Sequence, residues 1–183
     1  MRAGTTVGIL VTTLTLAPAR PALGQDAHSP EATARRVALS GGWGTGTNDF
    51  GGLASLSVGD ARADLILRWA ETTEWVIFRD PAESTSDVAL LYGRRVVRSR
   101  GWLRGSVGLG YVWAVRRGND EACWLFFCSH DRISSSSLGL ALQAEAVWAP
   151  WKPIGIGVTA VGNLNPEASF GALTVAVYLG VLR

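Results

Sequence analysis

The stretch that decides the fold runs from Ser137 to Trp148 and reads Ser-Leu-Gly-Leu-Ala-Leu-Gln-Ala-Glu-Ala-Val-Trp. Its three leucines, Leu138, Leu140 and Leu142, and Trp148 share one parity. The other parity is small or polar and includes Gln143 and Glu145. Successive side chains of a β-strand point to opposite faces. The segment is therefore predicted to be a strand with one apolar wall and one small, polar wall.

The same alternation recurs about eight times, and helical periodicity is absent. The strand lengths suit a tilted crossing of a bilayer, which takes about nine to eleven residues. The pattern therefore predicts an all-β chain, an eight-stranded antiparallel up-and-down transmembrane β-barrel. The predicted strands are Arg36 to Gly46, Phe50 to Val58, Ala63 to Thr73, Ser86 to Val97, Trp102 to Arg116, Ser137 to Trp148, Ile154 to Gly162, and Phe170 to the end.

The connections alternate in length. Those after the second, fourth and sixth strands are tight, and Pro150 and Pro153 break the chain at the last of them. Two others are long, Glu74 to Thr85 and Arg117 to Ile133. Short periplasmic turns and longer external loops are typical of outer-membrane barrels.

The N-terminus has the layout of an export signal. Arg2 is the only charge before Arg20, the stretch between them is largely apolar or Thr-rich, and small residues follow at Ala22 and Gly24. Such a segment is too short to span a bilayer as a helix. We expect residues 1–24 to be a signal peptide, residues 25–35 a flexible segment, and residues 36–183 the barrel.

Composition is consistent with this division. Removing 24 of the 183 residues leaves 159 and takes away Arg2 and Arg20, so that 15 basic residues balance 15 acidic ones. A neutral chain offers no electrostatic case for nucleic acid. The mean hydropathy of +0.19 together with 22 glycines is unusual for a soluble domain. A barrel with an apolar exterior and a glycine-rich interior has both properties.

Tryptophans cluster near both predicted ends of the barrel. Amphipathic rings collect at the two interfaces of a membrane, so we interpret these residues as two girdles. Their members are Trp102, Trp148 and Trp151 near the predicted periplasmic turns, and Trp43, Trp69 and Trp113 towards the external ends.

By its pattern, the segment from Arg36 to Arg183 resembles the small eight-stranded outer-membrane barrels of the OmpA and OmpX type. Its last residues, Val177-Tyr178-Leu179-Gly180-Val181-Leu182-Arg183, are similar to the C-terminal strand signal that barrel-assembly machinery reads, although many such proteins end on Phe. The resemblance implies the bacterial outer membrane, lipid and the assembly machinery as partners, and a non-enzymatic structural or surface-interaction role.

The polar parity would then line the lumen. It carries five charged residues near the predicted periplasmic turns: Asp64, Arg68, Arg95, Arg104 and Glu145. Charges inside so narrow a barrel should be paired, and antiparallel pairing places Arg104 near Glu145. We expect an ion-pair network that plugs the lumen, with a narrow ion-conducting pore as the alternative.

Two cysteines, Cys123 and Cys128, enclose Trp-Leu-Phe-Phe in the longest external loop. An exported protein can oxidise such a pair, so a disulfide is expected. Two thiols with only His130 and Asp131 nearby fall short of a usual zinc site, and neither a metal nor another cofactor is expected. The apolar tip is a candidate contact for an extracellular partner, the outer leaflet or the barrel rim.

The two alternative classes of protein are an enzyme and a soluble carrier. His130 lies between Ser129 and Asp131, but nothing in the sequence fixes the geometry that catalysis requires, so no enzyme is predicted. Gly41-Gly42-Trp43 matches the short Gly-x-Trp pattern of lipocalin-like carriers, which are exported soluble barrels. A carrier of that kind would turn its apolar parity inward around a small apolar ligand.

Overall fold

The computed structural model describes residues 36–182 except 61, 76–78, 81 and 125–126, and it describes the backbone alone for residues 79–80, 119–124 and 127–129. The expected signal peptide and the segment 25–35 lie outside this part. The strands are β1 (Arg36–Gly46), β2 (Asp49–Gly59), β3 (Ala63–Thr73), β4 (Arg79–Asp80), β5 (Ser84–Arg98), β6 (Gly101–Trp124), β7 (Phe127–Trp148), β8 (Ile154–Leu164) and β9 (Phe170–Gly180). Among the described residues, no helix is long and apolar enough to cross a membrane.

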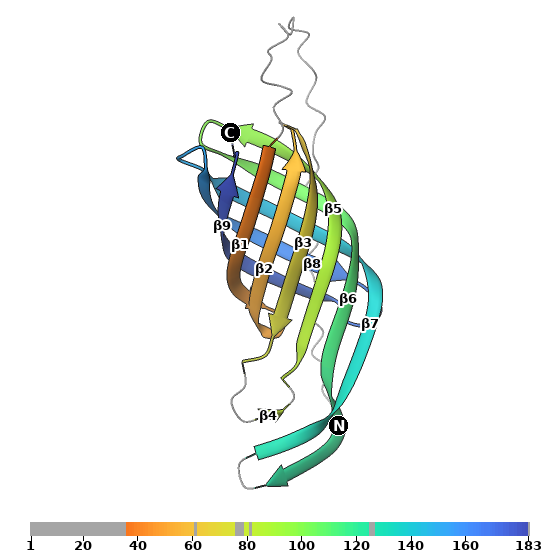
Figure 1. The fold of residues 1–183 in the computed structure, drawn as a ribbon. Coiled ribbons are helices and arrows are strands. Elements are labelled where there is room, and N and C mark those ends of the chain that lie inside the picture. The colour runs from red at the N-terminus through yellow and green to blue at the C-terminus, as the bar shows by residue number, and fades with distance from the viewer. Residues whose placement is uncertain (1–35, 61, 76–78, 81, 125–126, 183) are drawn as a thin grey trace, which may run out of the picture.

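Eight of the strands form a closed ring (Figure 1). Each is antiparallel to its neighbours. The first strand, β1, pairs with the last, β9, and this pairing closes the ring; β7 pairs with β8 like the other consecutive strands. Apart from β4, strands that are consecutive in the chain are neighbours in the ring, which is the up-and-down arrangement that the alternation predicts. Closure leaves no unpaired edge in the body of the barrel.

The apolar parity lies outside the ring and the polar parity inside. Leu138 is 72% exposed and Glu145 only 3%, although both belong to β7. The same alternation of exposed and buried residues follows β1, β3, β8 and β9. A soluble carrier needs the opposite arrangement, so the lipocalin-like alternative is wrong.

The two ends of the barrel differ. We call one the turn end, because three short turns close it at residues 60–62, 99–100 and 149–153. The chain also reaches its C-terminus there (Figure 1). We call the other the hairpin end, because β6 and β7 continue beyond the barrel as one long hairpin that contains a register shift between Arg117 and Glu121.

This hairpin corrects the prediction that the residues from Arg117 to Ile133 form a long loop between two strands. The pairing of β6 with β7 continues to Trp124 and Phe127, and the short β4 pairs in parallel with Cys128 and Ser129 of β7. Outside a bilayer neither face of a hairpin must be apolar. The period of two that marks the other strands is therefore lost from the sequence here, while the backbone pairing persists.

One of the predicted interface tryptophans faces inward. Trp102 is 4% exposed and packs in a buried cluster with Ala38, Val147 and Tyr178. Assigning it to a membrane girdle was wrong, because it shares the parity of the lumen residue Arg104. The remaining predicted girdle residues are exposed on the outer surface or in a turn: Trp43, Trp69, Trp113, Trp148 and Trp151.

Candidate functional site

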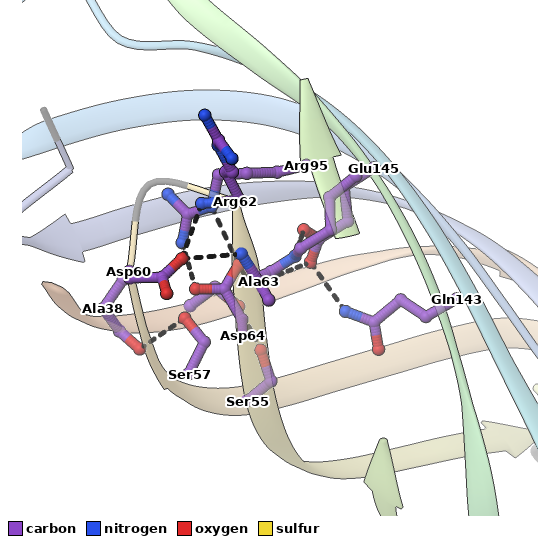
Figure 2. A network of polar contacts seen from close by, with 12 residues as sticks. Ala38, Ser55, Ser57, Asp60, Arg62, Ala63, Asp64, Arg95, Gln143 and Glu145 are labelled. Carbon is purple, nitrogen blue, oxygen red and sulfur yellow. Dashed lines mark hydrogen bonds and ion pairs between the residues drawn. The ribbon is translucent and has the colours of Figure 1, made fainter. Parts of the chain in front are cut away.

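The lumen near the turn end contains a carboxylate held between two arginines. Arg95 on β5 lies directly opposite Arg104 on β6, a placement in which like charges repel. Asp64 on β3 separates their charges: its Oδ2 accepts hydrogen bonds from Arg95 Nε at 2.8 Å and from Arg104 Nη1 at 3.1 Å. Figure 2 shows Arg95 reaching towards Asp64 from the neighbouring wall. The negative charge of Asp64 therefore offsets the repulsion between Arg95 and Arg104.

Arg104 also binds a second carboxylate, on the opposite side. Its register partner on β7 is Glu145, and the guanidinium donates from Nε to Oε2 at 2.5 Å and from Nη2 to Oε1 at 2.8 Å. Gln143 Nε2 donates to the same Oε1 at 2.6 Å (Figure 2). Such fork-shaped pairing is the strong form of an Arg–carboxylate contact. The predicted partners Arg104 and Glu145 are thus in direct contact. We call the group Asp64, Arg95, Arg104 and Glu145 the lower layer, and its formal charges cancel.

Arg68 belongs to a separate upper layer, closer to the hairpin end. It forms an ion pair with Asp87 on β5, and both side chains are fully buried. Asn163 Nδ2 donates to Asp87 Oδ2 at 2.9 Å, and Arg68 Nη1 donates to the carbonyl of Leu142 at 2.8 Å. This layer is also formally neutral. The five predicted lumen residues are therefore divided between two layers.

Asp87 and Asn163 were not predicted from the sequence. Asp87 follows Ser84-Thr85-Ser86, a polar run that resembles a loop more than a strand. A usable signal existed, because Asp87 has the inward parity of β5 and lies diagonally from Arg68, whose register partner is Ala89. Diagonal neighbours on one face of a sheet are within reach of long side chains.

Glycines leave the space that the upper layer occupies. Gly110 and Gly139 are register partners on β6 and β7. A Cβ on Gly110 would lie 2.7 Å from Asn163 Nδ2, and one on Gly139 would collide with Asn163 Oδ1. Real Cβ atoms do not come so close to neighbouring atoms, so this glycine pair is what admits the Asn163 amide to the lumen.

Aromatic rings close the lower layer towards the turn end. The Arg95 guanidinium lies over the Trp102 ring, 5.4 Å from its centre. Trp102 meets Tyr178 edge to face, with 5.7 Å between ring centres, and the Tyr178 hydroxyl is 2.6 Å from Thr159 Oγ1. A cation over an indole face is electrostatically favourable, and more so when water is excluded. Charge and aromatic packing are combined at this level of the lumen.

A third group of charges lies at the hairpin end and is partly exposed. Arg117 forms an ion pair with Glu74, and its Nε is 3.7 Å from Glu83 Oε1. Arg116 Nη2 donates to the carbonyl of Glu167 at 2.7 Å. Exposed pairs of this kind stabilise little. Their effect is to connect the base of the hairpin to the neighbouring connections.

The turn between β2 and β3 holds its own carboxylate outside the barrel wall. Asp60 Oδ1 accepts the backbone N–H groups of Arg62 at 2.7 Å and of Ala63 at 2.9 Å (Figure 2). These hydrogen bonds, that from Arg62 first, lower the pKa of Asp60 below its ordinary value of 3.8. Asp60 therefore stabilises the turn in its charged form.

Cys123 and Cys128 are register partners on the extended hairpin. Their side chains lie outside the part of the chain that the structure describes, so the disulfide stays a prediction. Among the residues that are described, no three His, Cys, Asp or Glu side chains come together as a metal site.

Comparison of the sequence with protein-family models and with curated proteins gives no match. Solved structures do match. The N-terminal β-barrel domain of Pseudomonas aeruginosa OprF matches with a TM-score of 0.50 at 9% identity, over 80% of this chain and 96% of that one.

A second match is the Yersinia pestis attachment invasion locus protein Ail, in complex with the heparin analogue sucrose octasulfate. It has a TM-score of 0.56 at 14% identity, over 80% of this chain and 98% of that one. Identities this low establish the fold alone. The chain therefore has the fold of the small eight-stranded outer-membrane β-barrels.

Proposed function

We propose that this chain is a bacterial outer-membrane protein whose lumen is closed to ions and whose role, structural or interactive, is performed by the long β6–β7 hairpin at the cell surface. The observation that carries the proposal is the pair of neutral, buried charge layers. A barrel whose lumen is filled in this way can contact a partner only through its outer surface and the segments that connect its strands.

The outer surface supports the membrane setting. Leucines and valines face outward around the ring, and several exceed 50% exposure, including Leu109, Leu138 and Val175. A closed antiparallel barrel satisfies its backbone hydrogen bonds internally, which is the condition for a β-structure to stand in hydrocarbon. The turn end then faces the periplasm and the hairpin end faces outward.

The lumen layers support a closed channel. An eight-stranded barrel is just wide enough for side chains to fill it. Arg68 and Arg104 are each held by a carboxylate from a neighbouring strand, and an ion passing through would have to break these pairs. The proposed role is non-enzymatic.

Planar-bilayer recording tests the closed lumen. Refolded wild-type protein is expected to give no current steps above the lipid baseline. Glu145→Ala is the informative variant, because it removes the carboxylate that holds Arg104 and leaves the upper layer intact. Discrete steps from the wild type would overturn the closed lumen and favour the narrow pore.

Protease treatment of intact cells tests the orientation. Trypsin cleaves after Arg117 and Arg132, which lie on the two strands at the base of the hairpin. Cleavage there is expected in intact cells that express the protein. Cleavage only after the outer membrane has been permeabilised would place the hairpin in the periplasm and contradict a surface role.

A further inference from the structure

The outer wall of the barrel is hollowed near the turn end. A depression of about 710 Å³ lies along β7 between β6 and β8. Ala146 is at its centre, and its register partners are Leu103 on one side and Val158 on the other. A methyl group between two larger apolar side chains leaves a hollow. Trp148 and Ile156 extend the apolar wall towards the turn end.

A second depression, of about 410 Å³, continues along the same strand towards the hairpin end. Its outward residue on β7 is Ala144, whose register partners are Gly105 and Ala160. A Cβ built on Gly105 would have no atom within 4 Å. The two depressions together form an apolar groove along β7 from Leu142 to Trp148. We call it the β7 groove.

The mouth of the groove is basic. Arg98, Ser99 and Arg100 line the wider depression where the β5–β6 turn meets it, and both arginines are exposed. The other exposed charges around the turn end are Arg62, Arg94 and Lys152, with Asp60 the one exposed carboxylate among the described side chains there. Asp60 is already engaged by its own turn.

The hairpin end has the opposite character. Its described side chains include five carboxylates, those of Asp49, Glu74, Glu83, Asp131 and Glu167, against three arginines, Arg116, Arg117 and Arg132. The excess of positive charge is therefore specific to the turn end, where the groove opens. A ligand complementary to this region carries a negative charge at the level of Arg98 and Arg100 and an apolar portion that extends along β7.

From this juxtaposition we infer that the β7 groove binds an anionic phospholipid of the membrane leaflet at the turn end, with its phosphate at Arg98 and Arg100 and an acyl chain along Ala146 and Ala144. The inference rests on the proposed membrane residence. The apolar lining favours a lipid over a free phosphate, because inorganic phosphate would gain nothing from it. Acyl chains surround the whole barrel, so selectivity for this site comes from the arginines.

Lipid retention tests the inference. The protein is refolded in neutral detergent, supplied with equal amounts of phosphatidylglycerol and phosphatidylcholine of matched chains, and examined by native mass spectrometry. An arginine close to an anionic lipid surface contributes a factor of about five. Two arginines predict that the wild type retains phosphatidylglycerol in about thirtyfold preference.

Three variants, one of them a control, separate the contribution of the lipid headgroup from that of the groove. Arg98→Gln with Arg100→Gln is expected to abolish the preference, whereas Arg116→Gln with Arg132→Gln removes the same charge from the hairpin end and should leave it unchanged. Ala146→Trp keeps both arginines but fills the hollow, so retention of either lipid should fall.

The inference is overturned if the preference survives the Arg98 and Arg100 substitutions, or if the control substitutions at the other end abolish it equally. If Ala146→Trp leaves lipid retention unchanged, the groove takes no part in binding and only the exposed basic residues attract the lipid. That result also overturns the inference. Heat-dependent gel migration reports whether each variant is folded, and Ala144→Leu replaces Ala146→Trp if the latter does not fold. Failure of the wild type to insert into vesicles contradicts the proposed membrane residence; insertion without lipid preference contradicts the lipid site alone.

Discussion

Asp64→Asn is the sharpest perturbation of the lumen. The substitution preserves shape and removes the negative charge that stands between Arg95 and Arg104, two arginines in direct register. Arg104 retains Glu145 as a partner. Arg95 retains only the face of the Trp102 ring among the contacts described above. The lower layer then has two buried positive charges and one negative charge.

The expected loss follows from the burial of these groups. The side chains of Asp64, Arg95 and Arg104 are all at most 3% exposed. Removing one partner of a buried ion pair costs about 3–5 kcal/mol, because the remaining charge is left uncompensated. The Asn amide oxygen still accepts one hydrogen bond. We therefore expect the free energy of unfolding to fall by about 3 kcal/mol, the lower end of that range.

Urea unfolding of the refolded barrel, followed by tryptophan fluorescence, measures this loss. Glu71→Gln is the matched control, because Glu71 is a carboxylate of the same strand on the outward parity, and it should change stability by no more than about 0.5 kcal/mol. Combining Asp64→Asn with Arg95→Met should cost less than the sum of the single variants by about 1 kcal/mol or more. A loss below about 1 kcal/mol for Asp64→Asn, or strict additivity, would refute the assigned role of Asp64.

Three further predictions concern other parts of the chain. Gly139→Ala should destabilise the barrel by about 1–3 kcal/mol in the same urea assay, because its methyl group meets the buried amide of the upper layer; Gly105→Ala, which meets nothing, should not. Asp60→Ala should lower the urea midpoint at neutral pH. Because the pKa of Asp60 is lowered in the folded state, its contribution is present above the ordinary value of 3.8 and is lost as the pH falls through the lower folded value, so the two midpoints should converge in acid. Cys123 and Cys128 should resist alkylation until a reductant is added, and ready alkylation without reductant would contradict the disulfide.

The barrel strands could be predicted from the sequence because a bilayer outside and a narrow lumen inside require different residues on the two faces of each strand. Arg36–Gly46 and Ala63–Thr73 have the predicted bounds, since apolar residues must face out and small or polar ones must face in. The same reasoning failed for β6 and β7 beyond Arg117 and Ile133. That hairpin extends beyond the barrel, where no bilayer requires one face to be apolar, so its backbone pairing leaves no alternation in the sequence to detect.

The candidate site was predictable where strand register alone decides proximity. Arg104 and Glu145 are direct partners across one strand pair, and their contact follows from the hairpin register. Asn163 reaches Asp87 from a distant strand across the lumen, a relation that depends on the tilt of the ring and on space left by glycines. Trp102 was misplaced for another reason: its position near a turn was weighed above its parity, although the parity of a strand residue is what determines its face.

The contacts of Arg68 affect the mechanical behaviour of the barrel. Besides Asp87, its guanidinium donates to the carbonyls of Leu142 on β7 and Gly162 on β8. β8 is four strands from β3 in either direction around the ring, so this single side chain spans a diameter. A change in lateral pressure that flattens the cross-section must stretch or compress that span. The ring is thereby held round from within at the height of Arg68.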